Sequence, residues 1–443
     1  MGRLEALRER LSQPVDVASL VAFRIVFGLA MFYEVARYFF WGFIERDYVA
    51  PSFHFTYVGF SWVHPWPGWA MYLHFYALGA LALCVLIGFC YRASIVLFFL
   101  GFAYVFLLDE VYYLNHFYLI TILAFLMAFV PAAGAFSVDA ARSPNTRTDH
   151  AARWQLWLIR GQLALVYFYA GLAKLDHDWL SGATMRCWLQ DTGDIPLLGR
   201  IFQLHHTPLL MSWCGLAFDL GIVPALTWRR TRPFAVLAAC AFHGLNLVLF
   251  DIGVFPPLML GATVMFFEPD WPRRVLGRVA PEATDRPPAR PWLSLLALWF
   301  TLQLTVPFRY LLYPGNPLWT DEANRFSWWM LLRYKVAQAR FVAHDPVTGQ
   351  DWEVRTGDYL SRAQSSTIIV WPDMIQEFAH HAGEELERRL GRPVEVRAQV
   401  WCSLNGRKAA LLVDPKVDLS RVPRDVWPAP WIAPRPGVAP PPQ

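Results

Sequence analysis

The sequence has few charged residues and lacks the usual motifs of soluble enzymes. Only 17% of its 443 residues are charged, whereas 56% are hydrophobic and 16% are aromatic. This balance excludes a soluble globular protein of ordinary composition. There is no internal repeat, no nucleotide-binding glycine pattern and no GxSxG nucleophile elbow. Any chemistry must therefore come from polar residues within the apolar segments.

Cysteine is also scarce. The chain has six cysteines, and they form no CxxC pair. Only Cys402 lies in the more polar C-terminal region, so we expect neither a disulfide framework nor a zinc knuckle there. A single pair between Cys402 and Cys187 remains an alternative.

Apolar segments recur along the chain up to residue 313. A helix needs about 20 mostly apolar residues to cross a bilayer. We predict spans at residues 17–40, 69–90, 93–108, 114–131, 155–174, 209–227, 234–250, 254–268 and 292–313. The first runs longer than a signal-peptide core and has no small-residue cleavage site, so we interpret it as an anchor.

These segments predict the fold class and the domains. We expect an α-helical integral membrane bundle of about nine transmembrane helices in residues 1–313, which would hold the functional site. A smaller β-rich or α+β soluble domain follows in residues 314–432, and a Pro-rich tail ends the chain in residues 433–443.

The arginines of the loops predict the orientation. Cytoplasmic loops of membrane proteins carry an excess of Lys and Arg, and arginine gathers here before the first predicted span and in every second loop after it. The other loops hold only Arg46, Lys174, Arg186 and Arg200. We therefore place the N-terminus in the cytoplasm and the C-terminal domain on the outer or lumenal side. The net charge of +4 then reflects topology and not binding to nucleic acid.

The C-terminal region contains a clear hairpin pattern and a clear helix pattern. Alternating residues from Val394 to Leu404, the turn pair Asn405-Gly406 and a return over Ala409 to Val413 predict a β-hairpin. Residues 372–390 carry apolar side chains at helical spacing and end at Gly391, which predicts an amphipathic helix.

Polar side chains inside the predicted spans are the candidates for a functional site, because each is costly at bilayer depth unless it is paired. They are Arg24, Glu34, Arg37, His74, Asn115, His116, Lys174, Asp219, His243 and Asn246. Glu34 and Arg37 are three residues apart on one helix face, which predicts an internal ion pair. We expect Asp219 to pair with an arginine in the same structural way.

Lys174 ends the apolar run that begins at Leu163, and two interpretations are open. The lysine could place its ammonium group among the lipid headgroups. Alternatively, an apolar pocket would disfavour the charged form and leave a neutral amine that acts as a base. In the second case Gly171 would let a helix or a flat ligand approach the backbone closely.

His116 and His243 have three open interpretations: structural hydrogen bonding, metal or haem ligation, and acid/base chemistry. No HxxxH, HExxH or ExxH spacing favours a metal site. His243 shares a helix face with Asn246, and Asn115 stands beside His116 at a predicted helix end. Both pairs are therefore suited to orient a polar ligand in a dry site.

Several motifs resemble the vitamin K-dependent γ-glutamyl carboxylases, a family of HTTM-domain membrane proteins. The longest similarity covers Arg160-Gly161-Gln162 and Tyr167-Phe168-Tyr169-Ala170-Gly171-Leu172-Ala173-Lys174-Leu175-Asp176-His177-Asp178-Trp179-Leu180. Others are Leu114-Asn115-His116, Phe242-His243-Gly244-Leu245-Asn246, Trp319-Thr320, Phe326-Ser327-Trp328 and Val400 to Arg407. The resemblance covers nearly the whole chain.

The resemblance implies an enzyme that oxidises vitamin K hydroquinone, or a related menaquinol, with O2. The strong base so produced removes a γ-proton from peptidyl glutamate, and CO2 adds to the carbanion. Lys174 falls on the family's lysine base, which would bind and deprotonate the hydroquinone, and His243 falls on an active-site histidine. Asn115 and His116 fall on positions that contact the quinone, with His116 also catalytic, and Asn246 is a further candidate contact. The implied partners are the lipid bilayer and a glutamate-containing peptide, with no nucleic acid and no metal.

Two departures from the family qualify this expectation. The chain is shorter than the animal enzymes in the soluble part, and it has no obvious equivalent of the cysteine pair that joins their two parts. The alternatives are a quinol oxygenase without peptide carboxylation, and a non-enzymatic scaffold or transporter. For an enzyme, we expect Lys174→Ala to abolish epoxide formation and to leave the fold intact, on the assumption that the amine faces solvent.

Overall fold

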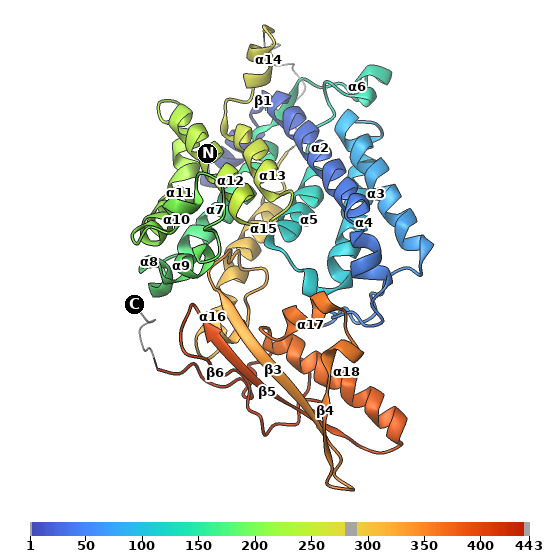
Figure 1. Ribbon diagram of the computed structural model, residues 1–443. Helices are drawn as coiled ribbons and strands as arrows, with labels where there is room; N and C mark the ends of the chain where they lie inside the picture. Colours follow the sequence, from blue (N-terminus) through green and yellow to red (C-terminus); the bar gives the residue numbers. More distant parts are fainter. Residues whose placement is uncertain (1, 280–289, 438–443) are drawn as a thin grey trace.

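The computed structural model describes residues 2–279 and 290–437. It contains a helical bundle and, at one end of it, a smaller body built on a sheet (Figure 1). The predicted fold class is therefore confirmed: an apolar helical part is followed by a sheet-containing C-terminal domain.

The helices of the bundle coincide with the predicted spans. In the described residues, seven segments are long and apolar enough to cross a membrane. They are α2 (Ala18–Phe40), α3 (Trp69–Ile87), α4 (Tyr91–Leu108), α7 (Arg153–Ala173), α11 (Thr207–Thr227), α12 (Arg232–Leu249) and the segment Leu293–Leu312, which joins α15 (Leu293–Thr305) to a 3-10 turn.

Two further apolar helices are shorter than a bilayer normally requires. These are α5 (Asn115–Met127) and α13 (Phe255–Ala262), which a 3-10 turn extends to Phe266. Nine helical segments therefore match the nine predicted ones, while a count of nine complete spans stays a prediction.

Short elements connect the spans. They are α1 (Arg3–Ser12), α6 (Val138–Arg142), α8 (His177–Leu180), α9 (Ala183–Leu189), α10 (Gly199–Phe202), α14 (Trp271–Val275) and the antiparallel strands β1 (Pro14–Asp16) and β2 (His150–Ala152). The arginine-bearing helices α6 and α14 lie at the end of the bundle far from the C-terminal domain (Figure 1). This arrangement agrees with the predicted alternation of charge.

The C-terminal domain is a four-stranded antiparallel sheet with helices on it. The strand order is β4 (Asp351–Val354), β3 (Lys335–His344), β5 (Glu395–Leu404) and β6 (Ala410–Leu411). Helix α18 (Pro372–Leu390) packs its apolar face on the sheet, where Phe378 lies 4.7 Å from Phe341 between ring centroids. The shorter helices are α16 (Pro317–Thr320) and α17 (Arg362–Ile368).

The predicted helix and hairpin of this domain are both confirmed. α18 has the predicted bounds and ends at Gly391, which adopts the left-handed conformation. In the hairpin, Asn405 and Gly406 have φ values of 51° and 75°, as a tight turn requires. The start of the Pro-rich tail lies against the domain, because the Ala433 amide donates to the Leu412 carbonyl at 2.9 Å. Tail residues 438–443 lie outside the described residues.

Candidate active site

A cavity of about 260 Å³ lies inside the bundle, close to the C-terminal domain. Its walls come from α5, α7, α11, α12 and α13, from Trp179 of α8 and Met185 of α9, and from residues 329–331 of the segment that leads into the sheet. Six of the ten candidate residues line it: Asn115, His116, Lys174, Asp219, His243 and Asn246. They include all five residues that the resemblance assigns to the site. Most of the remaining lining is apolar, so the cavity offers a few polar groups in a dry environment.

Lys174 is buried beside this cavity. The residue is only 5% exposed, and its Nζ donates hydrogen bonds to Asp219 Oδ2 at 2.6 Å and to the Ala170 carbonyl at 3.2 Å. The same nitrogen lies 4.9 Å from the centre of the Trp179 ring. The interpretation of Lys174 as a residue that reaches the headgroups is therefore wrong, and so is the assumption that its amine faces solvent.

Asp219 corrects a second expectation. Its partner is Lys174, the residue that directly follows α7, and not an arginine. Lys174 can reach Asp219 because α7 and α11 pack closely together. A Cβ at Gly171 would lie only 2.6 Å from Leu220 Cδ2. Gly171 thus serves helix packing, one of the two uses expected for it. The lysine amine has a carboxylate partner, so the candidate base is a pair and not an isolated neutral amine.

Both histidines contact the ring of Phe255. His116 stacks on this ring at 5.7 Å between centroids, and His243 meets it edge-on at 6.2 Å. His243 Nε2 lies 3.1 Å from the hydroxyl oxygen of Tyr167. Within residues 2–279 and 290–437, its buried Nδ1 has no hydrogen-bond partner. A buried nitrogen of this kind is a free position for a polar group of a ligand.

Asn115 is held by the segment that leads into the C-terminal domain. Its Nδ2 donates to the Trp329 carbonyl at 2.9 Å, and its Oδ1 accepts from the Tyr113 hydroxyl at 3.0 Å. The Phe326 amide in turn donates to the Tyr113 hydroxyl at 2.6 Å. Asn115 therefore has a fixed orientation at the cavity, whereas Asn246 is half-buried and lines the cavity from α12.

Other ionisable residues of the spans have structural partners. The predicted pair forms, with Arg37 Nη1 at 2.7 Å from Glu34 Oε2. Arg24 donates to the carbonyls of Ala132 and Phe136, and a His74 ring nitrogen lies 3.0 Å from the Gly101 carbonyl oxygen. In the described part of the chain, no group of three or more His, Cys, Asp or Glu side chains is placed to hold a metal ion.

Sequence reasoning missed Tyr167, Trp179 and Phe255. The first could have been found, because Tyr167 precedes Lys174 by seven residues and therefore lies on the same face of α7. Trp179 and Phe255 reach the site through contacts between elements that are distant in sequence, so no local sequence pattern predicts them.

Comparison with known families assigns both parts of the chain. Residues 12–271 match the HTTM domain, and residues 289–437 match the lumenal domain of vitamin K-dependent gamma-carboxylase. No solved structure matches the chain. The first match covers the helices that form most of the cavity, and the second begins before α15 and covers the whole sheet.

Proposed function

The chain belongs to the vitamin K-dependent gamma-carboxylase family, and on this basis we propose that it carboxylates peptidyl glutamate at the γ-carbon. The proposed reaction is coupled to the oxygenation of vitamin K hydroquinone, or of a related menaquinol, to its 2,3-epoxide. O2 and CO2 are the co-substrates.

One observation carries this proposal. Polar side chains from four helices, α5, α7, α11 and α12, converge on one apolar cavity, and a buried lysine–carboxylate pair lies in its wall. A purely structural ion pair would not need a cavity beside it. A non-binding scaffold would not need the unpartnered His243 nitrogen at the same place.

The cavity fits a lipid-soluble quinol. Its lining includes Val166, Met211, Phe242, Phe255 and Met259, which suit a flat apolar ring. Lys174, Asn115 and the two histidines provide hydrogen-bonding groups for the ring oxygens. When bound, the hydroquinone supplies, through its reaction with O2, the base strength that removes a γ-proton of glutamate.

The Lys174–Asp219 pair would accept the first proton. Burial disfavours two opposite charges relative to two neutral groups. The proton between Nζ and Oδ2, atoms 2.6 Å apart, can therefore pass to the carboxylate and leave a neutral amine. When the hydrogen bond from the protonated Asp219 to the amine opens, the lone pair of the amine can take the proton of a ligand hydroxyl, and Asp219 keeps the first proton in the meantime.

The other site residues would orient the ligand and exclude water. Asn115 is fixed by Tyr113 and Trp329, so its amide can hold a ring oxygen without reorganisation. His116 and His243 are 6% and 1% exposed, which keeps their hydrogen bonds in a medium of low dielectric constant. A base able to ionise a glutamate γ-carbon requires such a water-poor site.

The same family assignment supports a proposal for the membrane arrangement. The protein is a multi-pass membrane protein with a lumenal-type C-terminal domain. We propose that the N-terminus is cytoplasmic and that the glutamate-containing peptide approaches from the outer side, where the cavity meets residues 329–331.

The test is a product analysis on the purified protein in lipid. Reduced vitamin K, O2, radiolabelled CO2 and a glutamyl peptide are supplied together, and both the 2,3-epoxide and labelled peptide are measured. We expect both products. Epoxide without labelled peptide would support a quinol oxygenase instead. The absence of both, from folded protein, would support a scaffold or transporter.

A further inference from the structure

The tip of the β5–β6 hairpin reaches from the C-terminal domain to the helical part. Arg407 Nη1 lies 2.5 Å from Asp178 Oδ2, and Arg407 Nη2 lies 2.5 Å from Oδ1. Asn405 Nδ2 donates to Asp178 Oδ2 at 2.9 Å, and Arg435 Nη2 approaches the same oxygen at 3.4 Å. Asp178 belongs to α8, which begins three residues after Lys174. The hairpin thus binds the chain directly beside the candidate base.

The hairpin tip is itself fixed in position. The backbone amide of Asn405 donates to the Tyr334 carbonyl at 2.8 Å, and the Asn405 side-chain oxygen accepts from the backbone amide of Tyr334 at 2.8 Å. The turn packs against α9, because a Cβ at Gly406 would lie 3.3 Å from Cys187 Sγ. The side chains at the tip therefore meet Asp178 in a defined geometry.

Asp178 is held as a carboxylate. Burial alone would raise the pKa of Asp178, but the hydrogen bonds from Arg407 and Asn405 outweigh burial and lower it. The residue is only 3% exposed, so two-point binding by a guanidinium fixes both its charge and its orientation.

The residue that follows Asp178 touches the lysine. The ring of Trp179 lies 4.9 Å from Lys174 Nζ, and its Nε1 donates to the Ser212 carbonyl of α11 at 2.8 Å. Its ring also lies against Gly215, one turn before Asp219. A displacement of Asp178 would therefore move the ring that bounds the Lys174–Asp219 pair.

We propose that the hairpin tip of the C-terminal domain is a positioning element of the active site. Asn405 and Arg407, acting through Asp178 and Trp179, hold Lys174 against Asp219 at the edge of the cavity. This inference rests on the proposed role of Lys174 as the base. It also gives the soluble domain a part in the chemistry of the cavity.

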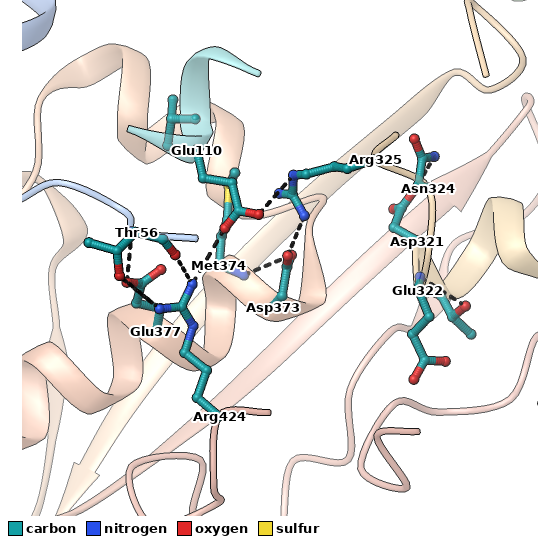
Figure 2. Close-up of polar contacts among 12 residues, drawn as sticks. Thr56, Glu110, Asp321, Glu322, Asn324, Arg325, Asp373, Met374, Glu377 and Arg424 are labelled. Atoms are coloured by element: carbon teal, nitrogen blue, oxygen red, sulfur yellow. Dashed lines mark hydrogen bonds and ion pairs between the residues drawn. The ribbon is translucent and has the colours of Figure 1, made fainter. Parts of the chain in front are cut away.

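A second contact between the two parts provides a matched control (Figure 2). Arg424 of the C-terminal domain lies against Glu377 Oε1 at 2.7 Å, against Thr56 of the helical part and, at 3.4 Å, against Glu110 Oε2. This guanidinium also joins the parts through buried carboxylates. In the described residues, no hydrogen bond, ion pair or ring contact links these partners to Lys174, Asp219 or Trp179. Loss of Arg424 would loosen domain docking alone.

The experiment compares Arg407→Gln with Arg424→Gln in the full-length protein. One readout is the rate at which an amine-acylating reagent modifies Lys174, measured by peptide mass spectrometry. The other is the kcat and KM of quinol epoxidation. For Arg407→Gln we expect Lys174 to be labelled about tenfold faster and kcat to fall about tenfold. The KM for quinol should stay unchanged. Arg407→Lys should restore part of the effect, and Arg424→Gln should change neither readout.

Equal effects of Arg407→Gln and Arg424→Gln, or no effect of either on labelling, would overturn the proposal. If Arg407→Gln does not fold, Asn405→Gly removes a donor to Asp178 and retains the positive φ of the turn, so the same comparison can be made. A wild-type protein that forms no epoxide would refute the proposed function, whereas the labelling comparison would still decide whether the hairpin controls the lysine.

Discussion

Lys174 and Asp219 form an ion pair with little access to water, and each is only 5% exposed. Removal of one partner from such a pair leaves a buried charge without compensation. The pair therefore determines both the chemistry of the cavity wall and the stability of the contact between α7 and α11.

This pairing changes what a lysine variant will do to the fold. We expect Lys174→Ala to destabilise the protein by about 3–5 kcal/mol, because Asp219 is left unpaired. Lys174→Met/Asp219→Asn removes both charges and should recover most of that loss. Thermal unfolding of the purified variants measures the difference. Equal losses in the single and the double variant would contradict the pairing.

Tyr167 provides a test of the histidine at the cavity. Its hydroxyl contacts His243 Nε2 at 3.1 Å, whereas the hydroxyl of Tyr169 donates to the Leu304 carbonyl outside the cavity. Tyr167→Phe and Tyr169→Phe should each cost about 1 kcal/mol of stability. Only Tyr167→Phe should lower the kcat of epoxidation, by about tenfold, because it releases the ring of His243. Equal kcat values for the two variants would mean that the Tyr167 contact is structural.

Most residues of the candidate site could be predicted from the sequence, but the pairing of Lys174 with Asp219 could not. A polar residue in an apolar helix is visible in a sequence because its cost is local, and six of the ten candidates found in this way line the cavity. The partner of Asp219 depends on which helices meet, and that information is not local. An arginine was expected there, and the lysine that directly follows α7 was found.

At the scale of helices, α7 and α11 bring the pair together. A Cβ at Gly171 would lie 2.6 Å from the side chain of Leu220 and 3.2 Å from its backbone nitrogen. The backbone atom cannot yield without a shift of the helix. The spacing of these two helices thus sets the distance between Lys174 and Asp219.

We therefore expect Gly171→Ala to push the two helices apart. It should cost about 1–3 kcal/mol through overpacking and should lower the rate of epoxidation. Gly221→Ala is the matched control, because it lies in α11 with no neighbouring atom within 4 Å of its added Cβ. The control should be neutral or stabilising by up to about 1 kcal/mol. Unfolding and epoxidation assays on both variants measure the difference. Identical behaviour of the two variants would exclude the role of Gly171 in setting the spacing of α7 and α11.

Helix bounds were the most predictable feature. The predicted and observed limits of α18 agree because periodic apolar residues and a terminal glycine mark them in the sequence. α5 and α13 were harder to assess, because their apolar runs are short and their depth depends on neighbouring helices.

At the scale of the whole molecule, polar contacts join the two parts of the chain. All six cysteines are free in the described residues, so the alternative Cys187–Cys402 disulfide does not form. Asp178 instead binds Arg407 and Asn405, and a second cluster centres on Glu110 and Glu377 (Figure 2). Sequence patterns did not indicate these contacts, since their partners are far apart along the chain.

The second cluster predicts how stability depends on pH. Burial raises the pKa of Glu110 to about 8 and that of Glu377 to about 7, although Arg325 and Arg424 oppose the shift. The folded protein therefore keeps these two carboxyl groups protonated at pH values at which the unfolded chain, with an ordinary glutamate pKa of 4.5, has released the protons. This contribution to stability is complete below that value and is lost as the pH rises through about 7 to 8.

The unfolding temperature should accordingly fall between about pH 5 and about pH 8.5. Glu377→Gln retains an oxygen that can accept from Thr56 and should flatten the dependence. Unfolding curves of both proteins across this range provide the measurement. A stability that rises with pH over this range, or an unchanged slope in Glu377→Gln, would contradict the assignment.

The most direct measurement is the rate of 2,3-epoxide formation from vitamin K hydroquinone by the wild-type protein and by Lys174→Met/Asp219→Asn. If the pair is the base, the wild-type protein forms epoxide and the folded double variant is slower by at least about 100-fold. A double variant that retains the wild-type rate would show that the proton goes elsewhere, and the assigned role of Lys174 would be wrong.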